Sequence, residues 1–128
     1  IEARKLTVAD IVGEKIYASP NTSLDEIISV LEKMNGVVIV DENMRPIGVV
    51  TSADLIYVDP AKIRSIKVSE VMGTNVPIVY EGEHLDENVI ELVSSNQVVA
   101  VIDREGRLKG TLYPRHIIEW LITSGRLR

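Results

Sequence analysis

Cysteine and phenylalanine are absent from the 128 residues, and aromatic side chains make up only 4% of the sequence. Without cysteine the chain has neither disulfide bonds nor thiolate ligands for a metal, and we expect a cytoplasmic location. The apolar runs are all shorter than the ~18 residues that a membrane-spanning helix needs, and the N-terminal residues lack the apolar core of a signal peptide. The sequence therefore predicts a protein with no membrane partner. Because it begins with Ile1 and not with methionine, we expect a piece of a longer protein.

Clustered positive charge is lacking as well. The formal net charge is −5, whereas a nucleic-acid-binding surface normally shows as grouped lysine and arginine. The two histidines, His84 and His116, are far apart in the sequence, and neither stands at the usual metal-ligand spacing from a second histidine. There is no Ser-His-Asp set and no glycine-rich phosphate loop, which leaves an acid–base pair of Asp54 and His116 as the one catalytic arrangement to consider. We predict that the chain is not an enzyme and binds neither metal nor nucleic acid.

What the sequence does contain is an internal repeat. Similar segments recur about 60 residues apart, and a repeat of that length buries too little apolar surface to be stable alone. We therefore predict two repeats, residues 1–62 and 63–128, that pack on each other as one module. The matching segments are Leu6–Gly13 with Ile66–Gly73, Leu24–Glu26 with Leu85–Glu87, Asp41 with Asp103, and Gly48 with Gly110.

Each repeat predicts the same order of elements: strand, helix, strand, strand, helix. Apolar residues at helical spacing predict the helices, capping residues such as Ser23 mark their starts, and runs of β-branched residues predict the strands. This order gives an α+β fold in which sheets pack under helices. A short helical turn is expected at 8–12, strands at 15–18, 37–40, 47–50, 76–79, 98–102 and 108–112, and helices at 24–34, 52–58, 85–95 and 114–123.

The stretch Gly48–Asp54 is the main candidate for a binding site. Val49 and Val50 suit a strand, and Thr51 with Asp54 has nearly the spacing of a capping box that opens a helix. A helix N-terminus presents free N–H groups that favour phosphate, and the Thr51 hydroxyl adds a hydrogen-bonding group. Asp54 would repel phosphate but would accept hydrogen bonds from ribose hydroxyls. The alternative is that Thr51 and Asp54 bind no ligand and only cap the helix, which would contribute about 1 kcal/mol to its stability.

The chain resembles the cystathionine-β-synthase (CBS) domain family in its tandem-pair form. The likeness rests on the two hairpins Val37–Val50 and Val98–Leu112, each with an aspartate in the turn and a glycine in the returning strand, and on Gly48–Asp54, which matches the family pattern Gly-h-h-Thr-x-x-Asp with h apolar. It covers nearly the whole chain. The resemblance implies two repeats related by pseudo-two-fold symmetry, with clefts that bind adenosine-containing ligands such as AMP, ADP, ATP or S-adenosylmethionine as effectors, no cofactor being required.

The resemblance also assigns residues to the site. Thr51 would contact phosphate or ribose and Asp54 the ribose hydroxyls. In the second repeat, Tyr113 stands in place of Thr51 and His116 in place of Asp54, which removes the ribose-reading carboxylate. Arg115 and His116 are candidates to hold a phosphate. The adenine would be bordered by Ile16, Tyr17, Ala18, Val37 and Val38.

The implied function is a regulatory module that senses an adenosine ligand and controls an attached domain or a partner. The alternative is a structural module that forms homodimers and has lost nucleotide binding, which the altered second motif favours. In either case we expect a homodimer formed through the apolar helices around Leu55–Tyr57 and Ile117–Leu121.

Overall fold

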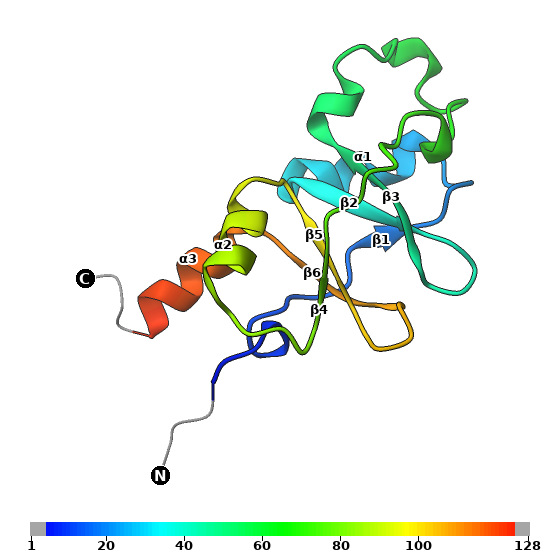
Figure 1. Ribbon diagram of the computed structural model, residues 1–128. Coiled ribbons are helices and arrows are strands. Elements are labelled where there is room, and N and C mark those ends of the chain that lie inside the picture. Colours follow the sequence, from blue (N-terminus) through cyan, green and yellow to red (C-terminus); the bar gives the residue numbers. More distant parts are fainter. Residues whose placement is uncertain (1–4, 125–128) are drawn as a thin grey trace. The chain divides into compact units, whose positions relative to one another are not determined.

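The computed structural model describes residues 5–124, and the chain forms two compact units (Figure 1). The central unit comprises residues 16–76, and the terminal unit comprises residues 5–15 together with 77–124. Each unit contains one three-stranded sheet with helices, so the α+β class predicted from the sequence is confirmed. The predicted repeats, 1–62 and 63–128, have a boundary after residue 62, whereas the compact units have boundaries after residues 15 and 76. Residues 1–4 and 125–128 of the predicted repeats lie outside the described part.

The central unit is built on a sheet in which β1 runs parallel to β2 and β2 runs antiparallel to β3. Helix α1 begins after Ser23, whose backbone N–H donates to Glu26 at 2.9 Å, as the capping box predicts. The apolar face of α1 packs on alternate residues of the strands and forms the core of this unit. The elements are β1 (Tyr17–Ala18), α1 (Leu24–Lys33), β2 (Gly36–Val40), β3 (Pro46–Thr51) and the 3₁₀ turns η2 (Ser52–Leu55), η3 (Pro60–Lys62) and η4 (Val68–Glu70).

The terminal unit repeats this plan with two full α-helices. Its sheet has the order β4-β5-β6, with a parallel first pair and an antiparallel second pair. Both helices contribute to its core: Val89 and Val93 come from α2 and Ile117 from α3, packed with Val99, Val101 and Leu112 of the sheet. The elements are η1 (Val8–Asp10), β4 (Ile78–Tyr80), α2 (Glu87–Ser94), β5 (Val99–Ile102), β6 (Leu108–Leu112) and α3 (Pro114–Thr123).

Each unit is completed by a segment that belongs, by sequence, to the other repeat. The second closing segment, residues 63–76, runs along the central unit, where Val49 and Gly73 exchange two backbone hydrogen bonds of 2.9 Å. The first closing segment, residues 5–15, runs along the terminal unit, where Gly13 N–H donates to the Thr111 carbonyl at 3.1 Å. Both segments carry the repeated Leu6–Gly13 pattern and dock along the corresponding strands, although the Thr111 N–H donates to Glu14 and not to Gly13.

The closing segments also seal the cores. Val8 and Val68, at matching positions of the two segments, are both completely buried. The residue that opens each first helix region is bonded to its closing segment: Leu24 N–H donates to the Ile66 carbonyl at 2.9 Å, and Leu85 N–H donates to the Leu6 carbonyl at 3.0 Å. The closing segments therefore satisfy backbone groups at the start of the helix region and cover apolar side chains at the same time.

The glycines of the returning strands are required by this docking. A Cβ on Gly110 would lie 2.5 Å from the Gly13 carbonyl oxygen and 2.5 Å from Val12 Cγ2. A Cβ on Gly48 would collide with the Met72 sulfur and lie 3.1 Å from the Gly73 carbonyl oxygen. At Gly110 the obstacle is backbone, so only a residue without a side chain allows this approach, whereas at Gly48 the nearest atoms belong to the flexible Met72 side chain.

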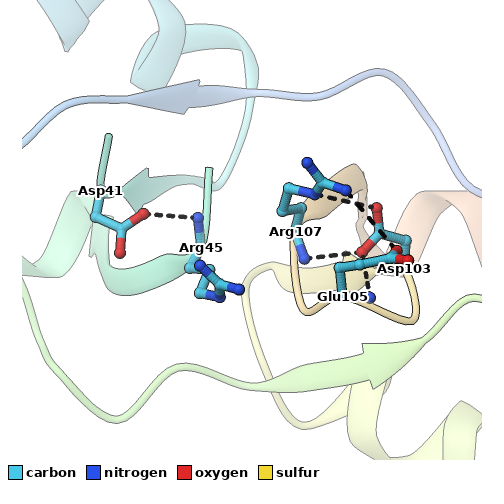
Figure 2. Close-up of polar contacts among 5 residues, drawn as sticks. All are labelled: Asp41, Arg45, Asp103, Glu105 and Arg107. Carbon is cyan, nitrogen blue, oxygen red and sulfur yellow. Dashed lines mark hydrogen bonds and ion pairs between the residues drawn. The ribbon is translucent and has the colours of Figure 1, made fainter. Parts of the chain in front are cut away.

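The two hairpin turns have the same aspartate-centred structure (Figure 2). The Asp41 carboxylate accepts hydrogen bonds from the backbone N–H of Asn43 and Arg45, both at 2.9 Å. Asp103 accepts from Glu105 at 2.9 Å and from Arg107 at 3.0 Å, and the bond from Arg107 is the main cause that lowers the pKa of the Asp103 carboxyl. The repeated aspartate is thus explained as a turn residue that fixes the hairpin.

One expected element is wrong. The helix predicted at 52–58 is a 3₁₀ turn, η2, that ends at Leu55, so the first repeat lacks the α-helix that closes the second. Two local causes explain the difference. Asp59 accepts a hydrogen bond from Ala61 N–H at 3.0 Å and starts η3, and Pro60 disfavours helical backbone at the residue before it. A segment of so few residues does not repay the cost of helix nucleation.

Candidate ligand site

Strand register brings together the predicted residues of the central unit at one end of its sheet. Tyr17 pairs with Val38 across the parallel strands β1 and β2, and Val38 N–H donates to the Ile16 carbonyl at 3.1 Å. Thr51 pairs with Gly36 at the other side of β2. The seven residues expected at an adenosine site in this half of the chain are therefore neighbours in the sheet, apart from Asp54, which follows in η2.

The predicted residues divide between the two faces of this sheet. Val37 is buried in the core under α1, and Ile16 and Ala18 pack against the same core, so these three present only backbone to a ligand. Strand side chains alternate, so Tyr17, Val38 and Thr51 share the opposite face. Tyr17 is 48% exposed there.

The open edge of β1 adds hydrogen-bonding groups to this end of the sheet. β1 is an edge strand, and the bond from Val38 to the Ile16 carbonyl fixes which residues of β1 face β2. Because alternate residues of a strand direct their backbone groups to opposite sides, the N–H and C=O of Tyr17 point away from β2. An edge that offers one donor and one acceptor suits the edge of a planar base.

Gly36 is a further candidate site residue that the sequence did not reveal. In the sequence, Asn35 and Gly36 together indicate the end of a helix. This interpretation accounts for the glycine without any role beside Thr51. In the sheet it is buried and pairs with Thr51 on the side opposite the core, so it places no side chain beside the hydroxyl. The register of the hairpin would have identified this position. Counting residues back along both strands from the turn at Asp41 places Gly36 opposite Thr51.

Thr51 and Asp54 form a fixed pair of hydrogen-bond acceptors. Asp54 Oδ2 accepts from the Thr51 backbone N–H at 2.8 Å and from the Thr51 hydroxyl at 3.3 Å, and both residues are half-buried. With its hydrogen directed to Asp54, the hydroxyl oxygen offers lone pairs, as the carboxylate does. This corner therefore suits a group that donates hydrogen bonds, such as a vicinal diol of a sugar, better than it suits a phosphate.

The counterpart in the terminal unit has a different chemistry. Tyr113 N–H donates to His116 Nδ1 at 3.0 Å, so an imidazole replaces the carboxylate in the same capping position at the start of α3. Tyr113 is buried, which raises the pKa of its phenol, while a hydrogen bond with Thr111 acts in the opposite direction. Arg115 is exposed and His116 half-buried at the start of α3. The phosphate-binding role of these two residues stays a prediction.

The state of His116 follows from its hydrogen bond. Nδ1 accepts the Tyr113 N–H, so the folded structure requires the imidazole to be neutral with its hydrogen on Nε2. Burial lowers the pKa of His116, the positive charge of Arg115 lowers it further, and Glu119 acts in the opposite direction. The ring also fills the space over Gly13, whose Cβ would lie 2.6 Å from His116 Cε1.

We predict a pH-dependent loss of stability that depends on this histidine. Because the pKa of His116 is lower when folded than its unfolded value of about 6.5, the unfolded state takes up the proton first. The free energy of unfolding therefore falls as the pH falls below about 6.5 and is unaffected by this group at higher pH. His116→Asn keeps an acceptor for the cap and should remove this part of the decline in urea titrations between pH 7.5 and 5. An unchanged decline in His116→Asn would contradict the assignment.

The described residues, 5–124, contain no group of three or more histidine, aspartate or glutamate side chains placed to hold a metal ion. In the same range, no helix has both the length and the apolar character that crossing a bilayer requires.

Comparison with known proteins identifies relatives over nearly the whole chain. The family model described as "CBS domain" matches residues 8–60 and again residues 68–123. Inosine-5'-monophosphate dehydrogenase of Aquifex aeolicus (strain VF5) is 28% identical over 124 residues, which is 93% of this chain and 25% of that enzyme. The chain therefore spans a quarter of the length of this curated relative.

Solved structures show the same fold. The CBS domain pair of protein MJ0100, in complex with 5'-methylthioadenosine and S-adenosyl-L-methionine, has a TM-score of 0.73 at 29% identity, with 96% of this chain and 99% of that chain covered. CBSX2, the CBS-pair protein of Arabidopsis thaliana, was solved in complex with AMP, and it has a TM-score of 0.80 at 24% identity, with 94% and 98% covered.

Proposed function

Because the chain belongs to the CBS domain family, we propose that it is a regulatory module whose central unit binds a small molecule containing adenosine. The observation that carries the proposal is the Thr51–Asp54 acceptor pair, set beside the open edge of β1 at one end of a sheet. An acceptor pair and a free strand edge are the two features that a nucleoside needs, one for the sugar and one for the base.

The ligand would be recognised by three kinds of contact. The backbone N–H and C=O of Tyr17 would pair with the edge of the adenine. The Asp54 carboxylate and the Thr51 hydroxyl would accept hydrogen bonds from the ribose diol. The Tyr17 ring, which is 48% exposed on the face that it shares with Thr51, would supply apolar surface, since Val38 itself is completely buried. The complexes of the MJ0100 pair, at 29% identity, support an adenosine ligand.

Regulation would act through the second closing segment. Thr51 is two residues beyond Val49, whose two hydrogen bonds to Gly73 attach that segment to β3. The segment ends at residue 76, where the chain enters the terminal unit. A ligand that binds one arrangement of this connection more tightly than another would shift the population between them by its difference in affinity. We propose that the shift controls an attached domain or a partner, that the module performs no catalysis itself, and that it acts in the cytoplasm.

We predict that Asp54→Ala weakens nucleoside binding. Loss of charged hydrogen bonds to the ribose should raise the Kd by about 10- to 100-fold. Isothermal titration calorimetry with AMP, ATP and S-adenosylmethionine would measure this change.

The chain offers a matched control for that experiment. Asp10 accepts hydrogen bonds from the backbone N–H and the hydroxyl of Thr7, at 2.8 and 3.3 Å, as Asp54 does from Thr51. Asp10 lies in the terminal unit, whereas the proposed site lies in the central unit. Asp10→Ala should therefore cost similar stability and leave the Kd unchanged. Absence of binding heat with all three ligands, or equal weakening in both variants, would contradict the proposed site.

The second candidate function, a homodimerisation module without a ligand, is favoured by exposed apolar side chains. Ile118 and Ile122, one turn apart on α3, are 52% and 58% exposed, and Ile56 and Tyr57 are 72% and 95% exposed. Exposed apolar pairs of this kind, one in each unit, commonly mark an interface. Sedimentation equilibrium should show a dimer that Ile118→Glu converts to monomer. If this function alone applies, the Tm should not respond to any adenosine ligand.

A further inference from the structure

The terminal unit contains the structural counterpart of the proposed site, and we infer that its own side chains Tyr113 and Val98 occupy the ligand's place there. The chain then binds one ligand, in the central unit alone. This inference rests on the proposed function and adds the property that decides which of the two similar units binds.

The equivalence of positions follows from the strand registers. Tyr17 pairs with Val38 in the central unit as Ile78 pairs with Ala100 in the terminal unit, and both pairs are parallel. The antiparallel pairs correspond in the same way, with Val37 opposite Val50 and Val99 opposite Leu112. Counting one residue along each strand places Val98 at the position of Gly36, and Tyr113 at the position of Thr51.

Size is the first difference between the two units. In the central unit the position next to the sugar-binding hydroxyl is a glycine, and the neighbouring side chain is a threonine. In the terminal unit these become Val98 and Tyr113, each 2% exposed. Val99 and Leu112 face the helix-covered core, so their neighbours Val98 and Tyr113 face the opposite side, as Gly36 and Thr51 do. Tyr113 remains in extended backbone (φ −116°, ψ 158°), close to that of Thr51 (φ −121°, ψ 170°), so the alternation continues to it.

Hydrogen-bonding character is the second difference. Asp54 presents acceptors, whereas His116 uses its single acceptor, Nδ1, for the Tyr113 N–H at 3.0 Å. The remaining nitrogen, Nε2, carries a hydrogen and donates. A Cβ on Gly13 would lie 2.7 Å from that nitrogen, so the first closing segment also crowds it. A ribose diol that needs acceptors finds none at this position, even if the tyrosine moved aside.

Calorimetry on the whole chain tests this inference. The wild type, titrated with AMP, ATP and S-adenosylmethionine, should bind one molecule of at least one of them per chain, and Asp54→Ala should lower that affinity by at least about 10-fold. In the Asp54→Ala background, Val98→Gly, Tyr113→Thr and His116→Asp together rebuild the central pattern in the terminal unit. This variant should regain one site per chain.

The outcomes separate the inference from the proposed function. Two sites in the wild type, or binding that survives Asp54→Ala unchanged, would overturn the inference and leave ligand binding established. No site regained in a rebuilt variant with a cooperative unfolding transition would also overturn it. A wild type that binds none of the ligands would overturn the proposed function and this inference with it. Amide NMR of the wild type needs no variant: shifts at residues 16–18, 36–38 and 51–54 alone support the inference, and equal shifts at 98–100, 113, 115 and 116 overturn it.

Discussion

Replacing Gly110 by alanine is expected to lower the free energy of unfolding by about 2–3 kcal/mol, which corresponds to a fall in Tm of about 10 °C. The added methyl group would lie 2.5 Å from the Gly13 carbonyl oxygen, and this oxygen belongs to backbone that is itself held by hydrogen bonds to Thr111. Neither partner yields by a simple rotation, so the first closing segment must move away from β6. Thermal unfolding followed by circular dichroism would measure the loss.

Gly73→Ala is the matched control for this substitution. Gly73 corresponds to Gly13 in the repeat and also lies in a closing segment, but the atom nearest to its added Cβ is the Val49 carbonyl oxygen at 3.8 Å. That distance is an ordinary contact, so a change in Tm of only a few degrees is expected. If the two variants lost equal stability, close docking of the closing segment would not be the reason for the glycine at position 110.

Leu24→Ala is expected to have the largest effect, a loss of about 3–4 kcal/mol in the free energy of unfolding. Leu24 is completely buried at the start of α1, between the helix, the sheet and the second closing segment. Truncation would leave a cavity lined by Ile27, Val50 and other core residues, while the backbone bond from Leu24 to Ile66 would remain. Urea denaturation would measure the difference.

The corresponding leucine of the other repeat provides the comparison. Leu85 is only partly buried and lies ahead of α2, which begins at Glu87. Leu85→Ala should therefore cost about 1–2 kcal/mol. Equal losses at the two positions would contradict the burial that separates them.

Elements whose signals are local could be predicted from the sequence. The strand Leu108–Leu112 and the helix Pro114–Thr123 were predicted with their observed bounds, because the strand repeats the pattern of the first hairpin and a proline stands at the first helical position. The start of α1 was predicted by Ser23 and Glu26, which form the capping box in the structure. These signals act between residues a few positions apart, where sequence patterns are informative.

Features that depend on distant residues could not be predicted. Gly36 becomes a candidate site residue only because Thr51 lies opposite it across the sheet. The orientation of Ile16 and Val37 toward the core depends on the register of β1 with β2, which no short pattern in the sequence specifies. The division of the chain after residues 15 and 76 depends on hydrogen bonds such as those of Val49 with Gly73, whose partners are far apart along the chain.

The crossed placement of the closing segments constrains how such a protein could have arisen. A single ancestral copy of the repeat, ending near residue 62, would have had its own Leu6–Gly13 stretch but no second one to lay along β3. If its β3 edge was sealed as it is now, that stretch came from another molecule, and the earliest form was an intertwined pair that traded N-terminal arms. Gene duplication and fusion would then have converted an exchange of segments between two molecules into contacts within one polypeptide. The compact unit 16–76 includes this arm, whereas a chain cut at residue 62 would lose the hydrogen bonds between Val49 and Gly73.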